Sequence, residues 1–270
     1  MTPALVTVLV AVTAAAVTYA ALGLRHRHAG LKGGIDLETT EASDGSAVDA
    51  VPSPSRFVGA AVALSMLIFA GIVLGGLAQG IERETVVVRW DERVERWASQ
   101  NAGVLGSDAL RLITHLGDTV VIVALAAVVA LTLLALRRRR LSLFVVLVVF
   151  GQWALSNLIK EAAARARPDL DPLAPFSGYS FPSGHATAAA ASYLALALVL
   201  VAVRPSWNER LIVAAGVGIA VAVAASRAML GVHWFSDVLG GLVLGWTWCV
   251  ACAWLMRLTR TSREQKLTAT

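Results

Sequence analysis

Charged side chains are scarce in this chain. Asp, Glu, Lys and Arg together make up 15% of its 270 residues, whereas hydrophobic residues make up 57% and the mean hydropathy is +0.70. A soluble globular domain usually has about 25% charged residues. The scarcity of charge therefore argues against a soluble domain and indicates a protein embedded in a lipid bilayer.

Cysteine is almost absent. The two cysteines, Cys249 and Cys252, are three positions apart within an apolar stretch. A C-x-x-C pair that acts in redox chemistry belongs to a strand-turn-helix context. No such context surrounds these residues, so we interpret them as small apolar residues that pack on a helix.

Seven apolar segments approach the roughly 20 residues that a helix needs to cross about 30 Å of hydrocarbon. We expect spanning helices at 3–24, 57–80, 119–136, 141–159, 185–203, 211–225 and 238–258. The predicted fold is therefore an all-α, polytopic helical bundle in a membrane. The spans follow one another without a second globular domain.

The N-terminal part has a different character from the rest. No charged side chain precedes the first apolar run, which favours a retained transmembrane helix over a cleaved signal peptide. The following stretch is rich in acidic, hydroxyl, glycine and proline residues and is typical of a flexible linker. The predicted units are an extra N-terminal transmembrane helix (1–24), a cytoplasmic linker (25–56), a six-helix membrane core (57–258) and a basic cytoplasmic tail (259–270).

The basic residues do not follow one polar face, as a nucleic-acid-binding surface requires, so we expect no nucleic-acid partner. They lie mostly at the ends of apolar runs and indicate the topology. Positive charge concentrates in three regions, at 137–140, 204–210 and 257–266. These regions and the linker should face the cytoplasm. Alternation then places the remaining connections on the outer face, at 81–118, 160–184 and 227–237.

An amphipathic segment lies between the second and third predicted spans. Trp90, Val94 and Trp97 recur at i, i+4 and i+7 among charged residues. This pattern predicts a helix that either lies on the membrane surface, where tryptophan is favoured, or covers the outer end of the domain.

Three polar clusters interrupt the apolar chain, at 160–168, 182–185 and 226–237, all on the predicted outer face. They contain four cations that need an anionic partner so close to hydrocarbon, namely Lys160, Arg165, Arg167 and Arg227. Arginine offers a planar fork for two phosphate oxygens and lysine a point charge, which suits a tetrahedral oxyanion. Any one of them could instead extend to the interface, but four together favour a phosphate site.

The other polar residues of these clusters have two possible roles. The segment 182–185, Pro-Ser-Gly-His, precedes a span, and exposed N–H groups at a helix start suit an anion, although an ordinary helix start has the same features. His233 and Asp237 are four apart, so a helix that begins near Trp234 lets the carboxylate reach one imidazole nitrogen. The other nitrogen is then free to attack. A lone histidine near a helix start is usually structural, but its pairing with Asp237 favours a nucleophile.

Together these residues form three motifs: K-x6-R-P at 160–168, P-S-G-H at 182–185 and S-R-x5-H-x3-D at 226–237. In order and spacing the motifs resemble those of the type-2 phosphatidic acid phosphatase superfamily. This family includes membrane lipid phosphate phosphatases, undecaprenyl pyrophosphate phosphatases, glucose-6-phosphatases and soluble vanadium haloperoxidases. The resemblance covers about residues 57–258, which correspond to the family's six-helix core.

The resemblance implies a role for each matched residue. His233 would attack phosphorus while Asp237 holds its other nitrogen, and His185 would protonate the leaving group and then help to activate water. The phosphate-binding residues would be Lys160, Arg167, Ser183, Gly184 and Arg227, with Arg165, outside the minimal motif, as a further candidate.

The resulting hypothesis is a phosphatase of a bacterial cytoplasmic membrane that acts on a lipid phosphate or diphosphate through a phosphohistidine, without a metal ion or other cofactor. The fixed cations would supply the positive charge that magnesium supplies elsewhere. Phosphatidic acid, phosphatidylglycerophosphate and an isoprenoid diphosphate such as undecaprenyl pyrophosphate all fit, with a slight preference for the diphosphate. A haloperoxidase is disfavoured because those members are soluble. A non-catalytic lipid-binding or transport protein with the same fold is disfavoured because every expected catalytic residue is present.

Overall fold

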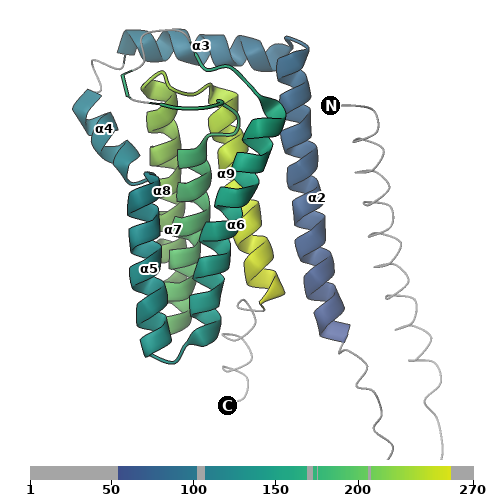
Figure 1. The fold of residues 1–270 in the computed structure, drawn as a ribbon, viewed down its shortest axis with the longest axis vertical. Helices are drawn as coiled ribbons and strands as arrows, with labels where there is room; N and C mark the ends of the chain where they lie inside the picture. Colours follow the sequence, from purple (N-terminus) through teal and green to yellow (C-terminus); the bar gives the residue numbers. More distant parts are fainter. Residues whose placement is uncertain (1–53, 102–106, 169–172, 175, 206–207, 257–270) are drawn as a thin grey trace, which may run out of the picture.

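The fold is helical throughout the part of the chain that the structure describes. This computed structural model covers residues 54–101, 107–168, 173–174, 176–205 and 208–256. The helices (Figure 1) are α2 (Pro54–Glu82), α3 (Val86–Asn101), α4 (Ser107–His115), α5 (Thr119–Ala135), α6 (Arg139–Ala163), α7 (Gly184–Val203), α8 (Glu209–Met229) and α9 (Phe235–Leu255). The helix expected at 1–24, the tail at 259–270 and most of the linker lie outside the described residues.

Five of these helices, α2, α6, α7, α8 and α9, are long and apolar enough to span a membrane. A sixth span results if α4 and α5, which are bent by 41° relative to each other, are counted as one. The all-α membrane bundle predicted from the sequence is confirmed. The helices also begin and end near the predicted positions. The span predicted at 185–203, for example, is α7, Gly184–Val203.

Close backbone packing joins α7 to α9. A Cβ on Gly241 would lie 2.7 Å from the carbonyl oxygen of Ser183, and one on Gly245 would lie 2.5 Å from that of Thr187. Small residues four apart are a common means by which membrane helices approach each other. The approach holds the beginning of α9 beside the beginning of α7, where two of the polar motifs lie.

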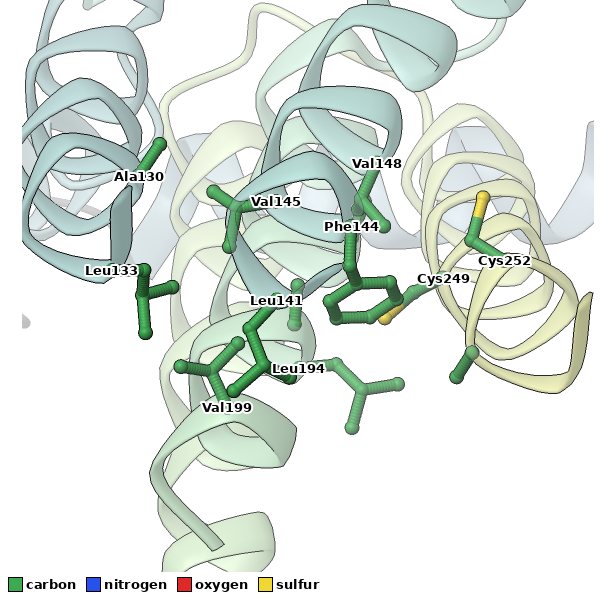
Figure 2. Packing of buried hydrophobic residues seen from close by; sticks show 13 residues of the cluster. Ala130, Leu133, Leu141, Phe144, Val145, Val148, Leu194, Val199, Cys249 and Cys252 are labelled. Carbon is green, nitrogen blue, oxygen red and sulfur yellow. The ribbon is translucent and has the colours of Figure 1, made fainter. Parts of the chain in front are cut away.

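A hydrophobic cluster fills the other half of the bundle (Figure 2). It is formed mainly by Leu141, Phe144, Val145 and Val148 of α6, Leu194 and Val199 of α7, and Cys249 and Cys252 of α9. Both thiols are free and buried among these apolar side chains. This position supports the interpretation of the C-x-x-C pair as packing residues.

The helix predicted around Trp90 is α3, and it lies across one end of the bundle (Figure 1). It packs against α8 and α9. Trp90 and Trp97 are about half exposed, whereas Asp91 on the same helix is buried. The helix therefore covers an end of the domain, and contact of its tryptophans with a membrane surface stays a prediction. The short helix α4 was not predicted.

Candidate active site

Four helix ends meet at the end of the bundle that α3 covers: the C-terminal ends of α6 and α8 and the N-terminal ends of α7 and α9 (Figure 1). They carry the three polar motifs. A cavity of about 970 Å³ opens there, and its wall includes Lys160, Arg167, Gly184, His185, Arg227 and His233. Six of the nine residues predicted from the sequence thus line one cavity.

His233 has a defined tautomer. Its Nδ1 lies 3.3 Å from Oδ2 of Asp237, and its Nε2 lies 3.1 Å from Nη1 of Arg167. A guanidinium offers only donors, so Nε2 must be the unprotonated nitrogen that accepts. The ring proton is then on Nδ1, where it is donated to Asp237. His233 therefore presents a lone pair at Nε2 on the side of the cations.

The local surroundings favour the neutral form of this imidazole. Burial is the largest cause that lowers the pKa of His233 below its usual range, and the charges of Arg167 and Arg227 act in the same direction. The hydrogen bond to Asp237 opposes them without cancelling the effect. At pH 7 the ring is uncharged, which is the state that a nucleophile requires.

Asp237 is fixed in place from several sides. It is completely buried in the first turn of α9. Its carboxylate accepts the backbone N–H of Trp234 at 3.0 Å and the hydroxyl of Ser180. It also accepts a charge-assisted hydrogen bond from Arg165 at 2.6 Å. These donors orient the carboxylate toward His233, as the pairing predicted from the four-residue spacing requires.

Lys160 and Arg167 are held by backbone carbonyl groups. Nζ of Lys160 donates to the carbonyl oxygen of Tyr179 at 2.9 Å, and Nη2 of Arg167 donates to that of Ser177 at 2.8 Å. Nη1 of Arg167 donates to the carbonyl oxygen of Val232 at 2.7 Å. Half-burial lowers the pKa of Arg167, but a guanidinium stays charged near neutral pH. Both side chains are fixed positive charges on the cavity wall.

Two buried polar atoms at the site have no hydrogen-bond partner among the described residues, Nε of Arg227 and Oγ of Ser183. Arg227 is only 4% exposed, and its Nη1 donates to the hydroxyl of Thr114 at 3.2 Å. Leaving a buried donor unsatisfied costs about 1–3 kcal/mol, and more for a charged group. Ser183 immediately precedes the first turn of α7, whose backbone N–H groups are also available to an acceptor. This set of donors fits a bound oxyanion.

Arg165 takes a different place from the one predicted. It is absent from the cavity wall, and its Nη1 donates to Asp237 while its Nη2 donates to Asp91 of α3 at 2.7 Å. The side chain also lies over the ring of Trp234, 5.2 Å from the ring centre. Its donors are directed at carboxylates behind the site, so the geometry favours a supporting role over phosphate binding.

Asp118 was not among the site residues predicted from the sequence. Its Oδ1 lies 2.8 Å from Nε2 of His185, and its Oδ2 lies 2.7 Å from Nδ1 of His115. An aspartate directly before an apolar helix is typical of an N-cap, but the side chain of Asp118 makes no capping hydrogen bond to α5. From the sequence, its position before the apolar helix predicts a capping residue. The absence of a capping hydrogen bond in the structure is what indicates another role for the carboxylate.

The cavity also has an apolar wall that continues between α5 and α6. It is lined by Ile122, Val123, Ala126, Ala127 and Ala130 of α5 and by Val146, Val149, Phe150 and Trp153 of α6. From Thr119 to Ala130 a helix rises about 16 Å, so this wall extends well below the cations. The cavity can therefore hold an anionic group at one end and an apolar chain at the other.

The chemistry of the polar end follows from its donors. Within the described ranges no three His, Cys, Asp or Glu residues gather in a way that could hold a metal ion. The arrangement offers three cations, a helix N-terminus and hydroxyl groups to a tetrahedral anion. It also places an uncharged imidazole nitrogen beside them, which suits nucleophilic displacement at the bound group.

Comparison with known proteins identifies relatives of this chain. This chain is 40% identical over 136 residues to phosphatidylglycerophosphatase B of Bacillus subtilis. The matched residues make up 49% of this chain and 66% of that protein. It is 37% identical over 115 residues to a lipid A 1-phosphatase of Rhizobium johnstonii, of which it covers 41%. The matches thus span less than two thirds of these two relatives. A decaprenylphosphoryl-5-phosphoribose phosphatase of Mycobacterium tuberculosis is 34% identical over 144 residues, which is 51% of this chain and 73% of that protein.

The fold has a relative among solved structures as well. The crystal structure of a transmembrane PAP2 type phosphatidylglycerolphosphate phosphatase from Bacillus subtilis is 28% identical, with a TM-score of 0.63. The similarity covers 76% of this chain and 96% of that one. The family model of the PAP2 superfamily matches residues 141–260, which contain all three motifs. The resemblance inferred from the motifs is confirmed, and the chain belongs to the PAP2 superfamily.

Proposed function

We propose that this chain is a membrane phosphatase that releases phosphate from a lipid through a phosphohistidine at His233, with no metal ion in the reaction. The proposal is carried by one observation, the meeting of a neutral His233, held by Asp237, with fixed cations around a single cavity. Phosphoryl transfer needs positive charge next to the oxygens of the phosphoryl group that do not react, and Lys160, Arg167 and Arg227 supply it.

The reaction has two steps. In the first, Nε2 of His233 attacks phosphorus, the bond from phosphorus to the lipid oxygen breaks, and His185 gives a proton to the leaving oxygen. In the second, a water oxygen attacks phosphorus while His185 accepts a proton from that water, and the bond from nitrogen to phosphorus breaks. His185 thereby recovers the proton that it lost, and inorganic phosphate is released.

A lipid substrate is supported by the shape of the cavity and by the relatives. The apolar wall between α5 and α6 offers a place for an acyl or isoprenoid chain while the phosphate lies among the cations. The relatives are a phosphatidylglycerophosphatase, a lipid A 1-phosphatase and a decaprenylphosphoryl-5-phosphoribose phosphatase. These relatives favour a lipid phosphate monoester as the substrate, with undecaprenyl pyrophosphate as the alternative.

We also propose that the site faces outward from a bacterial cytoplasmic membrane. The basic run Arg137–Arg140 lies at the opposite end of α5 and α6 from the site, and positive loops stay in the cytoplasm. A single cysteine at Ser177, in a variant with Cys249 and Cys252 replaced by alanine, should react with an impermeant thiol reagent in intact cells. A cysteine at Arg138 should react only after lysis. The reverse pattern would place the site in the cytoplasm.

The enzymatic proposal is tested with purified protein in detergent. Lipid phosphates are supplied with excess chelator, and phosphate release is measured for the wild type and for His233→Ala. We expect release that resists the chelator, is inhibited by vanadate and falls at least about a thousandfold in the variant. Rapid acid-free quenching with a radiolabelled substrate should leave the label on His233. Equal release by both proteins would rule out His233 as the nucleophile.

A matched pair of arginines on α8 separates the anion site from general effects of charge. Arg227 lies at the site, whereas Arg210 lies at the other end of the same helix and is exposed. Arg227→Ala should lower kcat/KM by at least about a hundredfold, because the transferred phosphoryl group loses one of the positive charges that stabilise it. Arg210→Ala should leave kcat/KM within about twofold, as is usual for an exposed side chain far from the site.

A further inference from the structure

Asp118 lies between two histidines at the junction of α4 and α5. One carboxylate oxygen pairs with Nε2 of His185 at 2.8 Å, and the other pairs with Nδ1 of His115 at 2.7 Å. The side chain of His115 is 64% exposed, whereas that of His185 is 26% exposed and faces the cavity. The carboxylate thus connects a residue of the site with one at the surface.

The turn that carries Asp118 is built to lie against His185. A Cβ on Gly117 would lie 3.2 Å from both Cβ and the carbonyl oxygen of His185, and 2.6 Å from Cγ1 of Val223. Only glycine permits this approach. The hydroxyl of Tyr193 on α7 also donates to the carbonyl oxygen of Leu116 at 2.8 Å, which ties the turn to the helix that carries His185.

The charges around His185 show why it needs a carboxylate. Lys160 of α6 and Arg227 of α8 line the same cavity, and the charges of both cations act on it. A protonated imidazole near two cations is repelled by both. Among the described residues, Asp118 is the negative group that acts on it, and it does so through a direct hydrogen bond. The acid form of His185 therefore depends on this one carboxylate.

We propose that Asp118 is a positioning residue that orients His185 and stabilises its protonated form for transfer of a proton to the leaving group. This inference rests on the proposed function and adds a residue to it. Asp118 accepts the N–H at Nε2, so Nδ1 is the nitrogen that gives its proton to the lipid oxygen in the first step and takes a proton from water in the second. Asp118 itself neither gains nor loses a proton.

The test compares two leaving groups. An alkyl phosphate needs a proton on its leaving oxygen, whereas a nitrophenyl phosphate leaves readily without one. Asp118→Asn should lower kcat/KM, which reports on the first step, by about tenfold to a hundredfold for the alkyl phosphate and by less than about threefold for the nitrophenyl phosphate. The alkaline limb of the kcat/KM profile for the alkyl phosphate should also move to lower pH. KM should change little, because Asp118 does not contact the phosphate.

Asp108→Asn is the matched control. It removes the same charge from α4 at a side chain that is 96% exposed, and kcat/KM on both substrates should stay within about twofold of the wild type. Equal losses on the two substrates in Asp118→Asn, with an unchanged pH profile, would overturn the proposal and leave Asp118 a structural residue.

An NMR measurement decides the pairing without activity. In protein labelled at histidine, the proton on Nε2 of His185 should give a downfield signal that is lost in Asp118→Asn and kept in Asp108→Asn. Absence of the signal in the wild type would overturn the proposal. A wild-type protein that shows the signal but releases no phosphate from any lipid or nitrophenyl phosphate would refute the proposed function and leave the pairing intact.

Discussion

Arg165 and Asp91 form an ion pair, with 2.7 Å between Nη2 and Oδ2, that links the surface helix α3 to the site. The same carboxylate of Asp91 accepts the backbone N–H and the hydroxyl of Ser236, each at 2.7 Å. Arg165 continues the network to Asp237, the partner of His233. A helix that covers the end of the bundle is thus linked, through Arg165, to the carboxylate that orients the proposed nucleophile.

Removal of Asp91 should destabilise the fold. Asp91→Ala leaves Arg165 and the N–H of Ser236 buried without this acceptor, and breaking a buried ion pair costs about 3–5 kcal/mol. The free energy of unfolding in detergent micelles, followed by circular dichroism, measures the loss. Glu92→Ala is the control, because its carboxylate is 48% exposed and forms an exposed pair with Arg96. The control should cost no more than about 1 kcal/mol. Equal losses in the two variants would contradict the structure.

Two glycine substitutions should have opposite effects on stability. A Cβ at Gly245 would meet the carbonyl oxygen of Thr187 at 2.5 Å, so Gly245→Ala must push α9 away from α7 and should cost about 1–3 kcal/mol. A Cβ at Gly218, on α8, meets nothing within 4 Å. Gly218→Ala should be neutral or stabilise the protein by up to about 1 kcal/mol, since alanine favours a helix. Thermal unfolding of both variants measures the difference, and a stabilised Gly245→Ala would refute the close packing.

The helices could be predicted because a membrane imposes one simple rule on them. A spanning segment is apolar along its whole length, so the span predicted at 119–136 is the helix α5, Thr119–Ala135. The helix α4 obeys no such rule. It has nine residues of mixed polarity, and its place depends on packing against α8. Its existence therefore could not be inferred from hydropathy.

The contacts of the site also fall into those that the sequence predicted and those that it could not predict. The pairing of His233 with Asp237 follows from a four-residue spacing at a helix start, and the structure contains it. The partner of His185 lies 67 positions away, and that of Arg165 lies 74 positions away. No local pattern predicts such pairs. From its positive charge alone, Arg165 was predicted to bind phosphate. Its contacts in the structure depend on α3, which folds over the site and brings Asp91 to it.

The acid limb of the activity profile should lie at low pH. Burial lowers the pKa of His233 below its usual value, so the free enzyme keeps the neutral nucleophile as the pH falls past about 6.5, the ordinary value for histidine. The value of kcat/KM, corrected for ionisation of the substrate phosphate, reports on the free enzyme. It should not decline between pH 7 and about 6, and the decline caused by protonation of His233 should appear only at lower pH. If kcat/KM instead fell on acidification with a midpoint above pH 7, His233 would be charged in the free enzyme at neutral pH.

The apolar wall between α5 and α6 should determine the preference for lipids. Ala126 lines this wall, whereas Ala124, two positions earlier on α5, is exposed and does not. Ala126→Trp fills the space proposed for the lipid chain, so KM for a long-chain lipid phosphate should rise by about tenfold or more. A short-chain, water-soluble phosphate does not reach this wall, and its kcat/KM should stay within about twofold. Ala124→Trp adds the same bulk elsewhere and should leave both substrates unaffected. A similar loss on both substrates in Ala126→Trp, with none in Ala124→Trp, would mean that the wall supports the site and does not bind the chain.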